Sequence, residues 1–78
     1  MNQNNISVTD KIRDIRLDIS WRELSRKYFD KPAAWLYERL DGVDENGNPC
    51  AFTPEETELL KGALCDLANR IRECSDSI

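Results

Sequence analysis

The sequence predicts an all-α fold, a domain of four helices, and three observations indicate it. Capping boxes, in which a Ser or Thr and a Glu three residues later satisfy the first amides of a helix, occur at Ser20 and at Thr53. Gly42 is a suitable helix stop. Residues 60–74 place apolar side chains at alternating spacings of four and three, the period of one helical face. A chain of 78 residues therefore predicts one small helical domain.

The N-terminal part of the chain is expected to form a tail and the first helix. Residues 1–6 are rich in Asn and Gln and lack periodicity, which predicts a flexible tail ahead of a single domain over 7–78. A helix is expected to begin after Ser7 or Thr9 as its cap. Its predicted apolar face, spaced by four, three and four, consists of Val8, Ile12, Ile15 and Ile19.

Residues 20–42 are expected to form two short helices joined by a tight turn. Trp21, Leu24 and Tyr28 share one apolar face of the first helix. Pro32 lacks an amide proton and disfavours helical geometry in the residue before it. The first helix therefore ends shortly before Pro32, which is predicted to be the first residue of the second.

The turn and the second helix complete this unit. Asp30, which tolerates left-handed backbone, is predicted to make the turn. Trp35, Leu36 and Leu40 are expected to point fully or partly inward, and Gly42 ends the helix. Two helices joined in this way usually form a helix-turn-helix, whose second helix enters the DNA major groove. Double-stranded DNA is therefore a candidate partner.

Two sequence runs carry a family resemblance. The runs LSRKYF at 24–29 and WLYERLDG at 35–42 resemble the helix-turn-helix of the Cro and lambda-repressor class. More closely, residues 20–73 are similar to a family of short proteins from Bacteroides-type gut bacteria, through that unit, the NGNP loop at 46–49 and the AFTPEE helix start at 51–56. The resemblance implies a small DNA-binding transcriptional regulator of phage or mobile-element type.

The turn departs from both of these patterns. Compared with the Cro class, the turn is one residue longer and has Phe29 where a glycine is usual. Compared with the closer family, Asp30 replaces the turn glycine and Asn48 replaces a loop lysine. The first change is expected to alter the angle between the two helices, and the last removes a positive charge.

The DNA-binding interpretation assigns contacts to the two helices of this unit. The helix over 32–41 would enter the major groove by its N-terminal end. The residues expected at the DNA are Arg22, Arg26, Lys27, Lys31, Ala33, Ala34, Tyr37, Glu38 and Arg39. The cations of the first helix are expected to hold phosphates, the two alanines to contact thymine methyl groups, and the glutamate to accept from a cytosine amine.

Charge leaves a second interpretation open. The chain carries 15 acidic and 11 basic residues, a net charge of −4 that opposes attraction to a polyanion. Residues 20–40 have a local excess of basic over acidic side chains, whereas residues 41–60 contain acids and no base. The alternative is a protein-protein interaction module that keeps the helix-turn-helix scaffold without binding DNA, and uses an exposed Trp35 or Tyr37 surface or the C-terminal helix.

The segment over 43–52 has two possible structures. Asn46-Gly47 is a strong hairpin signal and would make a small wing. Pro49 and the scarcity of β-branched residues favour a short ordered loop instead. Both remain open from the residues alone.

The C-terminal helix is expected to be long and to contact a second copy of the chain. Thr53 caps it, and residues 54–74 form it, beginning with Pro54. Its N-terminal half completes the core, whereas its C-terminal half projects apolar side chains that a partner helix can cover. The predicted homodimer interface consists of Leu67, Ile71, Cys74 and Ile78.

Composition argues against several other functions. The chain has no histidine, no glycine-rich phosphate loop and no ligand cluster, so no catalysis, metal or cofactor is expected. Cys50, Cys65 and Cys74 have no paired spacing and are expected to be free thiols. Neither an apolar run of membrane-spanning length nor a secretion signal is found, so a bacterial cytoplasmic location and no membrane partner are expected.

Overall fold

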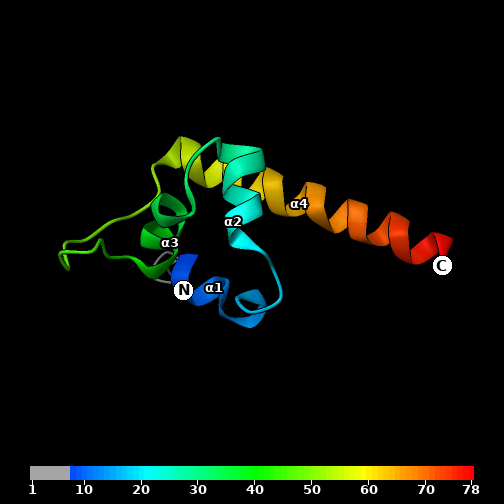
Figure 1. Cartoon of the computed structure of the whole chain (residues 1–78), viewed down its shortest axis with the longest axis horizontal. Helices are drawn as coiled ribbons and strands as arrows, with labels where there is room; N and C mark the ends of the chain where they lie inside the picture. Colours follow the sequence, from blue (N-terminus) through cyan, green and yellow to red (C-terminus); the bar gives the residue numbers. More distant parts are fainter. Residues whose placement is uncertain (1–7) are drawn as a thin grey trace, which may run out of the picture.

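The computed structural model describes residues 8–78, and it is helical along most of that length (Figure 1). The α-helices are α1 (Val8–Lys11), α2 (Trp21–Leu24), α3 (Ala33–Asp41) and α4 (Pro54–Ser77), with a 3-10 turn, η2 (Arg13–Ile15), and a π-helical turn, η3 (Ser25–Phe29). The described residues contain no strand. The predicted all-α domain of four helices is therefore confirmed, while the predicted tail over 1–6 lies outside the described residues.

The predicted continuous first helix is wrong. α1 ends at Lys11, η2 follows, and an irregular segment leads to Ser20. Thr9 lies inside α1 rather than capping it, and its hydroxyl donates to the carbonyl of Leu40 on α3. Ser7, the other predicted cap, lies outside the described residues.

A second side-chain bond lies in the irregular segment between η2 and α2. The indole Nε1 of Trp21 donates to the carbonyl of Arg16 at 2.8 Å, a backbone group that no helical amide would satisfy if the helix ended at Ile19. The apolar side chains of the predicted face still reach the core, since Ile12 is buried and Ile15 is half-buried against it. The apolar pattern therefore predicted which side chains pack inward, but it did not predict the backbone conformation of this segment.

α2 and η3 form one helical stretch that ends in a π turn. The Ser20 hydroxyl accepts from the Glu23 amide at 3.4 Å, as predicted. The Glu23 carboxylate pairs with Arg26 at 2.5 Å, so its predicted return to the Ser20 amide is replaced by an ion pair. The turn has one residue more than that of the Cro class, and the wider π-helical turn η3 accommodates this residue. Asp30 follows η3 with φ 57°. The predicted left-handed turn at Asp30 is confirmed.

α3 is positioned by its two ends. Pro32 is the N-cap with extended backbone, so α3 begins one residue later than predicted. Gly42 ends the helix with φ 85°, and its amide donates to the Glu38 carbonyl at 2.9 Å. A glycine suits this left-handed position because it has no Cβ. Leu36 and Leu40 are fully buried and Trp35 is half-buried, as predicted.

The core lies where α2, η3 and α3 meet the first half of α4 and the N-terminal segment. Its buried apolar residues are Ile12, Trp21, Leu24, Phe29, Leu36, Leu40, Leu60 and Ala63. The Phe29 and Trp35 rings pack with centroids 5.1 Å apart. Ser25 is buried among these apolar side chains.

The segment between α3 and α4 forms an ordered loop. A single antiparallel bridge joins Val43 and Pro49, and no paired strands flank it, so the short loop rather than the wing is observed. The Asp44 carboxylate accepts from the Asn46 and Asn48 amides at 2.8 and 2.9 Å. These bonds lower the pKa of Asp44, chiefly through the Asn48 amide.

α4 begins as predicted and ends later. Thr53 and Glu56 form a complete capping box, with Pro54 at the first helical position. The helix continues to Ser77, beyond the predicted end at 74, and at 1.5 Å per residue its 24 residues span about 36 Å. Its C-terminal part leaves the rest of the domain and projects alone, at the right of Figure 1.

Candidate nucleic-acid interface

Three of the cations predicted to contact DNA line one shallow surface depression. We call it the cationic hollow. It has a volume of about 400 Å³ and opens widely to solvent. Its lining residues are Arg22, Arg26, Asp30, Lys31, Pro32 and Ala33. The hollow therefore joins the outer face of α2 and η3 to the turn and to the first residue of α3.

A buried serine holds the turn that forms this hollow. The Ser25 hydroxyl lies 2.9 Å from the Lys31 carbonyl and 3.1 Å from the Pro32 carbonyl. The Lys31 amide in turn donates to the Ser25 carbonyl at 3.3 Å. These bonds join the π turn to the residues before α3, so they fix where Lys31 and Ala33 stand relative to α2.

Cationic side chains predominate around the hollow, and two carboxylates, those of Glu23 and Asp30, lie near them. Arg26 bonds to Glu23, and this bond is the main reason that the pKa of Glu23 is lowered. Neither Arg22 nor Lys31 forms an ion pair within residues 8–78. No side chain caps the N-terminus of α3, whose free amides carry partial positive charge. The arrangement can accept an oxyanion such as a phosphate.

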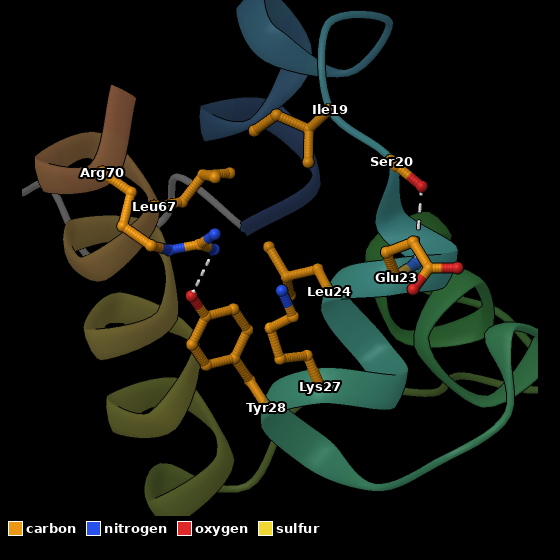
Figure 2. Close-up of a pocket in the computed structure, with 8 residues that line it drawn as sticks. All are labelled: Ile19, Ser20, Glu23, Leu24, Lys27, Tyr28, Leu67 and Arg70. Atoms are coloured by element: carbon orange, nitrogen blue, oxygen red, sulfur yellow. Dashed lines mark hydrogen bonds between the residues drawn. The ribbon is translucent and has the colours of Figure 1, made fainter. Parts of the chain in front are cut away.

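Lys27 does not join this hollow. It lines a separate depression of about 180 Å³ between α2, η3 and α4, which we call the corner hollow. Figure 2 shows the Lys27 ammonium pointing into that space, near Tyr28 and Leu24. The predicted phosphate contact at Lys27 therefore lies on a different side of α2 from those at Arg22 and Arg26.

A polar network beside Lys27 joins η3 to α4. The Tyr28 hydroxyl donates to the Asp66 carboxylate. It also accepts from the Arg70 guanidinium at 2.7 Å (Figure 2). Arg70 also bonds to Asp66 at 3.3 Å. The bond from Tyr28 is the main reason that the pKa of Asp66 is lowered, and Arg70 and Lys27 lower it further.

Replacing Tyr28 by phenylalanine is expected to raise the pKa of Asp66 toward its ordinary value, because the largest lowering contribution is lost. A folded-state pKa below the unfolded value stabilises the fold above the unfolded pKa, and this contribution disappears as pH falls through the folded pKa. The measurement is an NMR titration of the carboxyl carbons in both proteins. Asp44, held by backbone amides in a different segment, is the internal control; an unmoved Asp66 titration would contradict the role of Tyr28.

Arg39 is held inside the fold rather than offered to a ligand. Its guanidinium stacks over the Trp35 ring at 4.2 Å and bonds to the Trp35 carbonyl at 3.3 Å. It also lies 3.4 Å from the Glu56 carboxylate on α4. The pKa of Glu56 is lowered first by the Thr53 amide and then by Arg39. Arg39 thus connects α3 to the start of α4, and it does not line the cationic hollow.

The remaining predicted contacts line a third depression, which we call the acidic hollow. It has a volume of about 410 Å³. Its lining residues are Ala34, Tyr37, Glu38, Asp41, Val43, Asp44 and Glu45. Arg16 partly offsets the negative charge, since it bonds to Asp41 at 2.9 Å and lies 5.6 Å from the Tyr37 ring centre. The outward face of α3 is therefore divided between a cationic N-terminal end and an acidic remainder.

Residues 8–78 match the family described as a domain of unknown function, DUF5053. The match covers all of the described helices. This chain is a DUF5053 domain. No curated protein and no solved structure matches it.

Three features of this DUF5053 domain were not found from the sequence. The position of Ser25 in a hydrogen-bonded clamp has only a weak sequence signal, a small polar residue within an apolar helix face. Asp30 was predicted as a turn residue, but its place beside the cations was not. Asp44 and Glu45 belong to the acidic run over 41–60, but the surface that they share with Tyr37 was not predicted.

The three cysteines of the DUF5053 domain are free thiols. Cys50 is half-buried, and Cys65 and Cys74 are exposed. Within residues 8–78, no three metal-ligating side chains come together. None of the helices there is both long and apolar enough to cross a bilayer.

Proposed function

We propose that this DUF5053 domain is a small transcriptional regulator that binds double-stranded DNA through the cationic hollow. The observation that carries the proposal is the convergence of Arg22, Arg26 and Lys31 with the uncapped N-terminus of α3 around one open depression. Cationic side chains and helix N-termini are the groups that hold DNA phosphates in helix-turn-helix proteins. The proposal places the protein in the bacterial cytoplasm, where the chromosome lies.

The acidic hollow limits how much of α3 approaches DNA. Glu38 and Asp41 face outward in the C-terminal half of the helix, where they would repel phosphates. Contact is therefore confined to the first turn of α3, with Ala33 nearest to the bases and no long polar side chain available for reading them. Phosphate contacts supply most of the affinity in this arrangement, which predicts strong salt dependence and weak sequence preference.

Fluorescence-anisotropy titrations with duplex DNA at several salt concentrations test the proposal. The variants Arg22→Ala, Arg26→Ala and Lys31→Ala are each expected to weaken binding to all sequences. Each should reduce the slope of log affinity against log salt by about one, because one phosphate contact contributes about 0.9. Lys27→Ala is the matched control, since it removes the same charge from the side that faces the corner hollow.

Two outcomes of these titrations would contradict the proposal. One is the absence of binding by the unaltered protein at low salt. The other is an equal loss of affinity in Lys27→Ala and Lys31→Ala, which would indicate attraction by overall charge rather than by this surface.

Replacing Asp30 by asparagine is expected to strengthen DNA binding. Asparagine also tolerates left-handed backbone, and the change removes a carboxylate from the cationic hollow.

The acidic hollow favours a second candidate function, a protein-protein interaction module on the same scaffold without DNA binding. Tyr37 and Val43 are exposed there among four carboxylates. Such a surface suits a partner segment with basic side chains around an apolar one. A chain that fails to bind DNA at low salt would support this alternative.

A further inference from the structure

The last part of α4 carries an apolar face that no other part of residues 8–78 covers. Leu60 is buried in the core and Leu67 is half-buried against it. The same face continues past the core as Ile71, which is 60% exposed, Cys74, and Ile78, which is 99% exposed. We call residues 68–78 the arm. All of its side chains are exposed, and beyond Arg70, which bonds to Tyr28 on η3, it projects away from the other helices (Figure 1).

The corner hollow lies where the arm leaves the domain, and its lining combines apolar side chains with the charged groups of Glu23, Lys27 and Arg70. Ile19, Leu24 and Leu67 converge on it from three different segments (Figure 2). Leu17, two residues before Ile19 in the same connecting segment, is 96% exposed. A protruding helix with one uncovered apolar face and a partly apolar depression thus lie side by side on one molecule.

We propose that a second copy of this chain covers both features, with the two arms packed antiparallel and the tip of each in the corner hollow of the other. A two-fold interface requires one surface that is complementary to itself, and an arm beside a depression satisfies this requirement. The arm alone is too small, since its 11 residues span only about 16 Å and a stable interface buries about 800 Å² on each side. Adding the corner hollow and Leu17 extends the contact on both copies.

The position of the core decides the direction of the arms. In a parallel pair, the partner helix would have to continue along the face at Leu60 and Ala63, which the domain's own core already occupies. In an antiparallel pair, the partner helix ends at the corner hollow and does not need the face that the core occupies. Antiparallel packing of alternating four and three spacings sets Ile71 opposite Cys74 of the partner subunit, and Leu67 opposite Ile78 of the partner subunit.

The first test is the oligomeric state of the full chain under reducing conditions, measured by sedimentation equilibrium across micromolar concentrations. The unaltered chain is expected to form a dimer that dissociates on dilution. Ile71→Arg should weaken dimerisation at least tenfold without loss of helicity by circular dichroism, because Ile71 is exposed in the single chain. Asn69→Arg adds the same charge to the opposite side of the arm and should leave the dimer intact.

A disulfide test fixes the direction of pairing in a chain carrying Cys50→Ser and Cys65→Ser. Adding Ile71→Cys gives each copy a thiol opposite Cys74 of the partner subunit, and mild oxidation should then produce a covalent dimer. Cys74 alone should cross-link poorly, because antiparallel arms separate the two identical positions by about one helical turn. Efficient cross-linking through Cys74 alone would overturn the antiparallel arrangement. A chain that stays monomeric at all concentrations would overturn the dimer itself.

Discussion

Replacing Trp21 by alanine is expected to lower the free energy of unfolding by about 3–5 kcal/mol, enough to abolish a cooperative transition in a domain this small. Trp21 is only 1% exposed, and it packs in the core between the N-terminal segment and α3. Its removal leaves a large cavity and also frees the Arg16 carbonyl that its indole holds at 2.8 Å. Urea denaturation followed by far-ultraviolet circular dichroism measures the loss.

Trp21→Phe separates packing from hydrogen bonding at this site. Phenylalanine keeps an aromatic ring in the core and removes the indole donor, so a smaller loss of about 1–2 kcal/mol is expected. An alanine variant no less stable than the phenylalanine variant would show that the buried ring contributes little, contrary to its position.

Replacing Ser25 by valine is expected to cost about 2–5 kcal/mol, the second largest effect. Valine leaves the Lys31 and Pro32 carbonyls without the hydroxyl that lies near both, at about 1–3 kcal/mol. It also forces two methyl groups into a fully buried position, at a further cost of about 1–3 kcal/mol.

Ser25→Thr is the matched variant, because threonine has nearly the shape of valine and retains the hydroxyl. The difference between the two urea midpoints therefore reports the hydrogen bonds alone, while the loss shared by both reports crowding. Equal midpoints would indicate that the Ser25 hydroxyl does not hold the turn, and the cationic hollow would then lack the clamp described for it.

Features that depend on neighbouring residues were predicted well from the sequence. The start of α4 at Thr53 and Pro54, the left-handed turn at Asp30 and the stop at Gly42 all follow from the chemistry of a few consecutive residues. The end of α1 at Lys11 was not predicted, and neither was the bond from the Thr9 hydroxyl to the Leu40 carbonyl on α3, 31 residues away. Apolar spacing alone does not report such a bond.

The residues of the candidate site also differ in whether neighbouring residues determine their positions. Arg22 and Arg26 share the outer face of one helical stretch, so their meeting with Lys31 follows from local structure. The positions of Lys27 and Arg39 depend on where α4 packs, which their own sequence neighbourhood does not indicate. α4 brings the corner hollow beside Lys27 and the Glu56 carboxylate beside Arg39.

α4 is one uninterrupted helix from the capping box at Thr53 to Ser77, so its two ends cannot turn independently of each other. Each residue advances the axis by about 1.5 Å and rotates it by about 100°. A single insertion between the core and the arm would therefore change the facing of everything beyond it, whereas an insertion of seven would nearly restore the phase. Insertions can therefore lengthen this segment and keep the direction in which the arm faces only when they add a nearly whole number of helical turns.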